Sequence, residues 1–187
     1  MNIILFGPPG AGKGTQSKYL EKKLNNFQVS TGDMLRDEIK QETEIGKKII
    51  NYMNDGKFVD DEIVNKLMEN VIFNPKLKGK LICDGYPRTI IQAKNLETWL
   101  NKSDQKIDFI FFLNVDKDTI IKRIEKRKII EKRSDDDLNI ILKRYDTYME
   151  TTKPVLDYYS NKSNFNEIDG RLKITEITNK INSILKV

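Results

Sequence analysis

The feature that most constrains the fold is a glycine-rich segment near the N-terminus, Gly7–Thr15, with the sequence GPPGAGKGT. It directly follows the apolar run Ile3–Phe6 and opens a pattern typical of a helix. Glycine lets the backbone curl until its N–H groups approach phosphate oxygens, and the start of the next helix adds its positive end. From this loop Lys13 can reach the β- and γ-phosphates of a nucleotide. The start of the chain therefore predicts a strand, a phosphate-binding loop and a helix.

The segment departs at one position from the general pattern G-x-x-x-x-G-K-[ST]. Gly14 stands where a Ser or Thr would bind magnesium, and Thr15 follows one residue later. The alternative is a turn that merely joins a strand to a helix. The strand–loop–helix context that the motif demands is present, so phosphate binding is favoured.

Short apolar runs separated by helical patterns predict the rest of the fold. Five runs are candidate strands: Ile3–Phe6, Phe27–Val29, Leu81–Cys83, Phe109–Leu113 and Asn164–Ile168. The predicted helices are Gly14–Leu24, Asp60–Phe73, Thr89–Leu100, Lys117–Arg127, Asp136–Tyr159 and Lys173–Leu185. Continuous apolar runs are typical of parallel strands buried on both faces. The alternation predicts a three-layer α/β/α fold with a five-stranded parallel sheet.

Two segments do not fit this alternation. Residues 30–59 hold helical patterns but no convincing strand, and residues 128–135 form a short charged link. Both are expected to be insertions at the ligand end of the sheet, where α/β proteins place their sites.

The composition narrows the class of protein. A length of 187 residues fits one domain, and no apolar run approaches the roughly 18 residues of a transmembrane helix. The N-terminal segment lacks the features of a secretory signal. Cys83 is the one cysteine and there is no histidine, so neither an internal disulfide nor a structural zinc site is expected. A cytoplasmic location is expected for the same reason. The net charge of +5 fits either ordinary surface bias or an anionic partner.

Further polar groups are placed to bind an anion or a base. Arg36 follows a Ser/Thr turn that begins a helix, and Arg88 follows the run Leu81–Cys83 and the acidic Asp84. Capping and turn chemistry are the plainer explanations for such groups. An early-helix arginine can also hold phosphate in a bidentate grip, and a strand-end carboxylate can hold magnesium-bound water. Gln92, one helical turn after Arg88, has the donor and acceptor pair that an adenine edge needs.

Four arginines in the second half of the chain form another candidate group: Arg123, Arg127, Arg133 and Arg144. A solvated basic face is the plainer interpretation for a chain with 33 Lys and Arg residues. Beside a phosphate-binding loop, convergence of such donors is what phosphoryl transfer needs, because negative charge spreads over the transferring group.

These motifs together resemble the adenylate kinases, a family of nucleoside-monophosphate kinases, along the whole chain. Gly7–Gln16 matches the family's GPPGAGKGTQ pattern, Thr31–Arg36 is similar to its AMP-binding segment, and Asp84–Arg88 matches its Asp-Gly-Phe/Tyr-Pro-Arg motif. The intervals between the four arginines match the short-lid form of the family. Thr31 and Gln92 resemble adenylate kinases rather than uridylate–cytidylate kinases.

The resemblance implies roles for individual residues. Catalytic roles fall to Lys13, Asp84, Arg88, Arg127, Arg133 and Arg144, with Mg²⁺ held through water by Asp84. The implied ATP site is Gly10, Ala11, Gly12, Lys13, Gly14, Thr15, Arg123, Arg127, Gly170 and Leu172. The implied AMP site is Thr31, Arg36, Lys57, Phe58, Val59, Gly85, Tyr86, Pro87, Arg88, Gln92, Arg133 and Arg144.

The implied reaction is reversible transfer between ATP and AMP to give two ADP, with Mg²⁺. The implied organisation is one domain of residues 1–187, with a core of 1–29, 60–125 and 137–187, an AMP-binding insertion at 30–59 and a short lid at 126–136. We expect a monomer whose partners are nucleotides, without nucleic acid or membrane. The alternatives are another monophosphate kinase, acting on CMP, UMP or dTMP, and a non-catalytic nucleotide- or RNA-binding module.

The first prediction concerns metal. Because the chain has no histidine and one cysteine, no structural metal should stabilise the fold, whereas phosphoryl transfer should require Mg²⁺. EDTA should abolish turnover and leave the melting temperature of the ligand-free protein unchanged within about 2 °C. A large drop in melting temperature on chelation, measured by calorimetry, would contradict the prediction.

Overall fold

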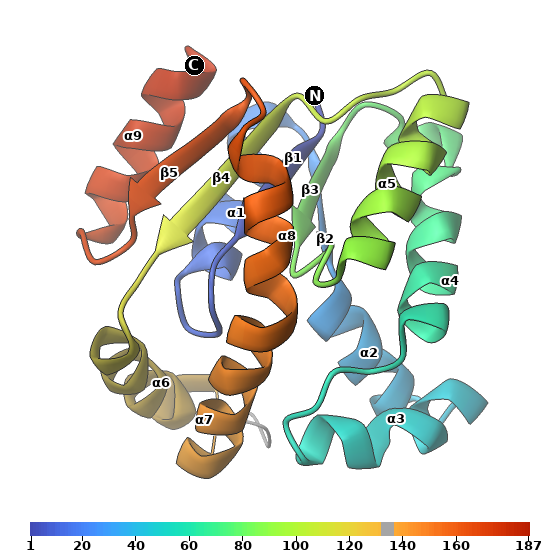
Figure 1. Ribbon diagram of the computed structural model, residues 1–187, viewed down its shortest axis with the longest axis vertical. Coiled ribbons are helices and arrows are strands. Elements are labelled where there is room, and N and C mark those ends of the chain that lie inside the picture. The colour runs from blue at the N-terminus through green and yellow to red at the C-terminus, as the bar shows by residue number, and fades with distance from the viewer. Residues whose placement is uncertain (132–136) are drawn as a thin grey trace.

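Five parallel strands form the centre of the computed structural model, which describes residues 1–131 and 137–187 (Figure 1). The strands lie in the order β2-β3-β1-β4-β5. Their bounds are β1 Ile3–Phe6, β2 Phe27–Ser30, β3 Leu81–Asp84, β4 Phe109–Asn114 and β5 Phe165–Asp169. Each expected run is a strand, with ends that differ by one residue at most. The predicted α/β fold with a five-stranded parallel sheet is confirmed.

Helices cover both faces of this sheet, with α8 in front of it and α1 behind it in Figure 1. Their bounds are α1 Lys13–Leu24, α2 Thr31–Lys40, α3 Glu44–Asn54, α4 Asp61–Ile72, α5 Ile90–Lys102, α6 Lys117–Glu131, α7 Leu138–Thr147, α8 Lys153–Ser160 and α9 Ile174–Leu185. A 3-10 turn lies at Pro75–Leu77 and a π-helical turn at Tyr148–Thr152.

The strands separate two hydrophobic cores because successive side chains of a strand point to opposite faces. Ile4 and Phe6 of β1 belong to the core under α4, α5 and α8. Ile3 and Leu5 belong to the core under α1, α6 and α9. In the central register Ile4 lies opposite Cys83 on one side and Ile110 on the other, and all three are buried. A strand buried on both faces explains why β1 is apolar at every position.

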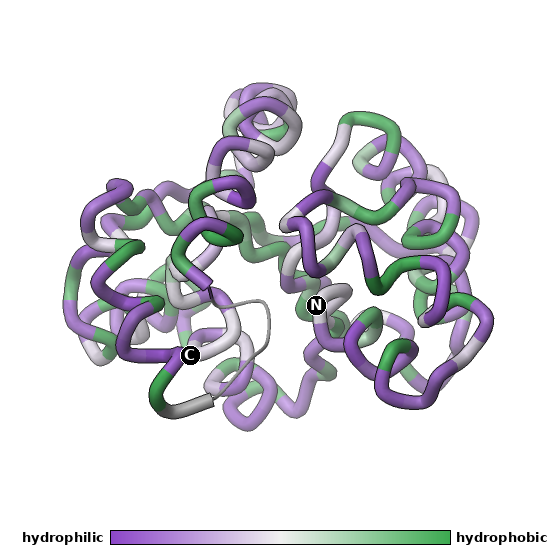
Figure 2. The backbone as a smooth tube through the Cα atoms, turned by 90° about the horizontal axis from the view of Figure 1, so that it is seen from below, coloured by the Kyte–Doolittle hydropathy of each residue, from purple (hydrophilic) through white to green (hydrophobic). Residues whose placement is uncertain are grey.

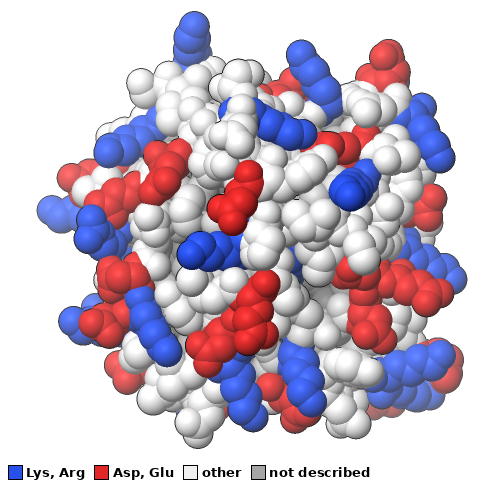
Figure 3. Space-filling model, in the orientation of Figure 1, with Lys and Arg blue, Asp and Glu red and all other residues white. Residues whose placement is uncertain are grey.

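The outer helices mix hydrophilic and hydrophobic stretches along the chain (Figure 2). This is the pattern of helices that cover a core on one side and meet water on the other. On the face drawn in Figure 3, Lys and Arg side chains are intermixed with those of Asp and Glu. Within the described ranges, no helix has the length and apolar character needed to cross a membrane.

The helical stretch expected over Asp136–Tyr159 is helical from Leu138 on, but it is not an α-helix throughout. The π-helical turn separates α7 from α8, and Lys153 donates its backbone N–H five residues back to the carbonyl of Tyr148. Pro154 explains the interruption, because a proline lacks the N–H that an α-helix would direct to the carbonyl of Glu150, and its ring crowds that carbonyl.

The expected link at 128–135 is also partly wrong, because α6 does not end at Arg127 but continues to Glu131. Residues 128–131 contain neither Gly nor Pro and include good helix formers, so the helix has no reason to stop earlier. Residues 132–136 lie outside the described part of the chain.

Helices α2 and α3 occupy the segment 30–59 and pack closely at Gly46. A Cβ atom placed on Gly46 would lie 2.1 Å from the backbone oxygen of Glu38, at the end of α2. Thr43 caps α3 through the N–H of Gly46 and also donates its hydroxyl to the Glu38 carboxylate. The absence of a side chain at Gly46 therefore sets the distance between the two helices.

Gly46→Ala should lower the free energy of unfolding by about 1–3 kcal/mol, the usual cost of overpacking. The direction is informative, because alanine is otherwise about 1 kcal/mol better than glycine inside a helix. Asn51→Ala, on the exposed surface of the same helix, is the matched control and should be neutral or stabilising. Urea denaturation measures both; equal or higher stability for Gly46→Ala would contradict the close contact.

Candidate active site

The site lies at the edge of the sheet where the parallel strands end. The loops after β1, β2 and β3 meet there because parallel strands have their carboxyl ends on one edge. Strand β1 pairs with β3 on one side and β4 on the other. The connection after β1 leads toward β2 on the first side, whereas the connection after β3 leads to β4 on the second side. Open α/β sheets bind their ligands at such a switch point.

The phosphate-binding loop owes its shape to glycine. Gly10 and Gly12 have φ values of 81° and 100°, in the left-handed region that favours glycine. Lys13 begins α1 and folds back over the loop, where its Nζ donates to the carbonyl oxygens of Gly7 at 2.8 Å and Pro8 at 3.2 Å. These two hydrogen bonds hold the lysine across the loop.

Burial of its ammonium group lowers the pKa of Lys13 from 10.5 to about 8. The Asp84 carboxylate opposes this shift, and the positive charges of Arg88, Arg144 and Arg127 add to it. The unfolded chain binds more protons than the folded one between these two pKa values. As far as Lys13 is concerned, the free energy of unfolding therefore rises with pH through that window.

A pocket opens beside the loop, on the side of β3. It is lined by Leu5, Phe6, Gly7, Pro9, Lys13, Phe58, Gly85, Pro87, Arg88, Arg144, Tyr148 and Thr152. Contacts hold both the side chain and the backbone of Arg88. Its Nε donates to the Gly85 carbonyl at 2.8 Å, and its guanidinium lies 4.7 Å from the ring centre of Phe58. Its backbone carbonyl accepts from the Thr152 hydroxyl at 3.1 Å. Two arginines and one lysine therefore line one pocket, which suits an anion.

Several expected acceptor residues do not line this pocket. The Lys57 side chain is exposed and forms an ion pair with Asp55 at 3.2 Å. Val59 and Tyr86 are buried in the core with 6% and 1% of their surface exposed. Arg36 pairs with Asp33 at 2.6 Å.

Two other expected residues, Thr31 and Gln92, form hydrogen bonds to the loop after β3, part of which lines the pocket. Thr31 donates its hydroxyl to the Gly85 carbonyl at 2.9 Å and so ties the start of α2 to the loop after β3. The Gln92 side chain is buried, with 3% of the residue exposed, and its Oε1 accepts from the backbone N–H of Arg88 at 2.7 Å. Both side chains hold the pocket's own loop in place.

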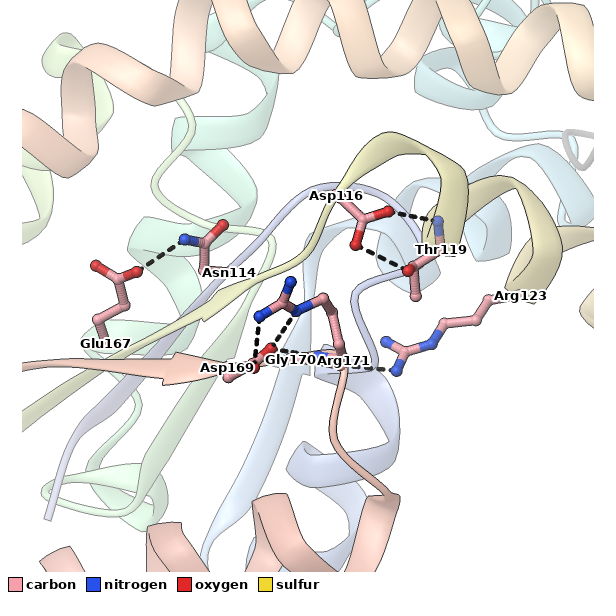
Figure 4. A network of polar contacts seen from close by, with 8 residues as sticks. All are labelled: Asn114, Asp116, Thr119, Arg123, Glu167, Asp169, Gly170 and Arg171. Carbon is pink, nitrogen blue, oxygen red and sulfur yellow. Dashed lines mark hydrogen bonds and ion pairs between the residues drawn. The ribbon is translucent and has the colours of Figure 1, made fainter.

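The other side of the phosphate loop faces β4 and β5. Arg123 of α6 donates to the carbonyl oxygen of Gly170 at 2.7 Å (Figure 4). It also donates to the carbonyl oxygen of Ala11 at 3.2 Å. This guanidinium joins the phosphate loop to the loop after β5. Leu172 packs against the second core, and Thr15 is exposed on α1.

Three further expected residues are Arg127 and Arg133, predicted to stabilise charge, and Asp84, predicted to hold the metal through water. Arg127 is half-buried, and its charge contributes to the lowered pKa of Lys13. Arg133 lies outside the described residues. A Cβ atom on Gly14 would lie 3.5 Å from the Asp84 carboxylate, which places Asp84 directly beside the phosphate loop.

Mg²⁺ fits such a site, because it is usually held by one or two carboxylates together with substrate phosphates and water. In residues 1–131 and 137–187, no group of three or more His, Cys, Asp or Glu side chains gathers to hold a metal.

Sequence reasoning missed three residues at this site. Tyr148 and Thr152 line the pocket from the π-helical turn, and π-turns are frequent at functional sites. Pro154 was the signal for that turn. Asp61 accepts from the Gln92 amide at 2.6 Å, but in the sequence it is an ordinary acidic residue in the first turn of a helix.

A strand, a glycine-rich phosphate loop and a buried lysine at the switch point of a parallel sheet define a P-loop protein. Comparison with known proteins narrows the class. The family model described as adenylate kinase matches residues 5–164.

Relatives named adenylate kinase align with the whole chain or nearly so. The one from Pelagibacter ubique is 50% identical over 213 aligned positions that cover all of both chains. One from Mycoplasma mycoides is 40% identical, again over all of both chains, and one from Caulobacter sp. strain K31 is 40% identical over all of this chain and 99% of its own.

The chain belongs to the adenylate kinase family. It is a phosphotransferase, which agrees with the loop and with the cations gathered around it.

The pKa of Lys13 predicts the pH dependence of nucleotide capture. kcat/KM for the phosphate donor reports the free enzyme, so it should fall about tenfold per pH unit above about 8, where Lys13 loses its proton. The fall in kcat should begin at a higher pH than the fall in kcat/KM, because bound phosphates favour the charged form of Lys13. Lys13→Arg, whose guanidinium does not titrate in this range, should have a lower plateau without that falling limb. A wild-type kcat/KM that stays level to pH 9.5 would contradict the lowered pKa of Lys13.

Proposed function

We propose that this chain catalyses the reversible, Mg²⁺-dependent transfer of a phosphoryl group from ATP to AMP, giving two ADP. The observation that carries the proposal is the pocket beside the phosphate loop, which Lys13, Arg88 and Arg144 line together, with the charge of Arg127 also close enough to act on Lys13. The transferring phosphoryl group spreads negative charge over its oxygens, and a cluster of cations suits such an anion.

The proposal divides the residues between two substrates. ATP binds with its phosphates in the loop, through Gly10, Ala11, Gly12, Lys13, Gly14, Thr15, Arg123, Arg127, Gly170 and Leu172. AMP binds at the pocket beside β3, where Phe58, Gly85, Pro87, Arg88 and Arg144 form part of the lining. The other residues that we propose for the AMP site are Thr31, Arg36, Lys57, Val59, Tyr86, Gln92 and Arg133. The exposed side chain of Lys57 limits that residue to contacts through its backbone. The buried Val59 and Tyr86 support the site from the core.

Asp84 would hold Mg²⁺ through water. It follows β3, lies beside the loop and accepts from Gln28 at 3.2 Å, which leaves oxygen lone pairs for a second donor. When bound, the metal would neutralise charge on the phosphates of ATP. The protein's own contribution is positioning and charge stabilisation, and no side chain needs to form a covalent bond.

The short lid is part of the proposal. The alignment with the Pelagibacter relative runs over 213 positions, although this chain has 187 residues, so the relative has a part with no counterpart here. We assign the lid to 126–136, the acceptor insertion to 30–59 and the core to 1–29, 60–125 and 137–187. The acceptor insertion contacts the core: a Cβ atom on Gly56 would lie 2.8 Å from the carbonyl oxygen of Ile140 in α7.

The proposal includes a monomer in a reducing, cytoplasmic setting, with ATP, AMP and ADP as partners. The one cysteine, Cys83, is buried and free, which suits a reducing compartment. On the face drawn in Figure 3 the charges are intermixed, which is unlike a nucleic-acid-binding face, where one sign of charge usually gathers.

A turnover panel tests the proposal. With ATP as donor, AMP should be phosphorylated faster than CMP, UMP, GMP or dTMP, because a buried Gln92 amide left unpaired by the wrong base costs about 1–3 kcal/mol. If CMP or UMP is the best acceptor of the purified protein, the protein is another monophosphate kinase. Salt-sensitive RNA binding without turnover would instead favour a non-catalytic module. Asn51→Ala, far from the pocket lining, serves as the activity control.

A further inference from the structure

The side chain of Gln92 is held at both ends of its amide. Its Nε2 donates to Asp61 Oδ1 at 2.6 Å, and its Oε1 accepts from the backbone N–H of Arg88 at 2.7 Å. The residue is buried, with 3% of its surface exposed. A buried amide with a strong partner on each side cannot rotate freely in its site.

Asp61 is itself anchored. Its second oxygen, Oδ2, accepts from the Thr89 hydroxyl at 2.7 Å, and that hydroxyl in turn accepts from the backbone N–H of Gln92 at 3.2 Å. Asp61 begins α4, and Thr89 caps α5. The carboxylate therefore joins two helices and touches both ends of the first turn that carries Gln92.

The chemistry of these partners decides which way the amide points. An ionised carboxylate only accepts hydrogen bonds, and a backbone N–H only donates. Both therefore require Nε2 toward Asp61 and Oε1 toward Arg88. In the flipped amide, the carbonyl oxygen would face the carboxylate of Asp61 and the NH₂ group would face the N–H of Arg88. Two independent contacts thus select the same orientation.

We propose that Asp61 is a specificity-determining positioning residue, which fixes the orientation of the Gln92 amide and so selects a 6-aminopurine over a 6-oxopurine as the acceptor base. The inference rests on the proposed function, in which Gln92 meets that base. Once Asp61 and Arg88 have taken one bond each, Gln92 retains one N–H donor and one acceptor lone pair, in a fixed order.

That order distinguishes the two kinds of purine. A 6-aminopurine carries a donor on C6 beside a ring nitrogen that accepts. A 6-oxopurine carries an acceptor on C6 beside an N–H that donates, so its edge has the reverse order. The fixed amide suits the first and opposes the second. A site built to pair its polar groups rejects an analogue that leaves them unpaired far more strongly than an apolar pocket does.

Asp61→Asn tests the proposal, because an asparagine side chain offers a donor as well as an acceptor, so that only the backbone N–H of Arg88 still opposes the flipped Gln92. The ratio of kcat/KM for AMP to kcat/KM for IMP should fall at least about tenfold, through a loss with AMP, a gain with IMP, or both. KM for ATP should stay within about twofold, because Asp61 lies on the acceptor side. Glu62→Gln removes a charge from the adjacent, exposed position of α4 and should leave the ratio unchanged.

The ratio is measured on one preparation, so any unfolded fraction affects both substrates equally and cancels. Asp61→Glu is the conservative variant: it keeps a group that only accepts and should retain more of the AMP preference than Asp61→Asn. An unchanged ratio in Asp61→Asn, with wild-type enzyme preferring AMP, would overturn the inference and leave the proposed function intact. A wild-type enzyme without preference for AMP over IMP would instead overturn the proposed acceptor itself.

Discussion

Burial of the sheet on both faces is the constraint on which the rest of the molecule depends. Ile3 and Leu5 pack on one side of β1 while Ile4 and Phe6 pack on the other, so helices must cover both faces. Helical crossovers supply that cover, and the strands that they connect run parallel. Parallel strands end on one edge. The phosphate loop, the start of α2 and the loop after β3 are thereby brought together, although they lie far apart in the sequence.

The same edge concentrates positive charge. The ammonium group of Lys13 is buried against loop carbonyls, with the charges of three arginines nearby and Asp84 as the opposing carboxylate. This arrangement lowers the pKa of Lys13 and disfavours the protonated folded state at neutral pH. A bound phosphate favours the protonated lysine, so it offsets the free energy that this charge costs the folded chain.

The acceptor side is held by contacts between neighbouring elements rather than by the pocket alone. Thr31 ties α2 to the loop after β3, Asp61 ties α4 to α5, and Thr152 ties the π-helical turn to Arg88. Each bond fixes a backbone or side chain that the proposed AMP site uses. Arg123 does the same on the donor side by joining the phosphate loop to Gly170.

The sequence by itself determined the five strands, the phosphate loop and the family, because apolar runs, glycines and the Asp-Gly-Tyr-Pro-Arg segment depend on local chemistry and spacing. It also identified Arg88 and Arg144, which the fold brings to one pocket. Only the tertiary structure decided that Lys57 points to Asp55, that α7 breaks at a π-helical turn, and that Asp61 orients Gln92. A side chain's direction and partners depend on contacts between elements distant in sequence, and a carboxylate at a helix start looks the same whether it faces water or a buried amide.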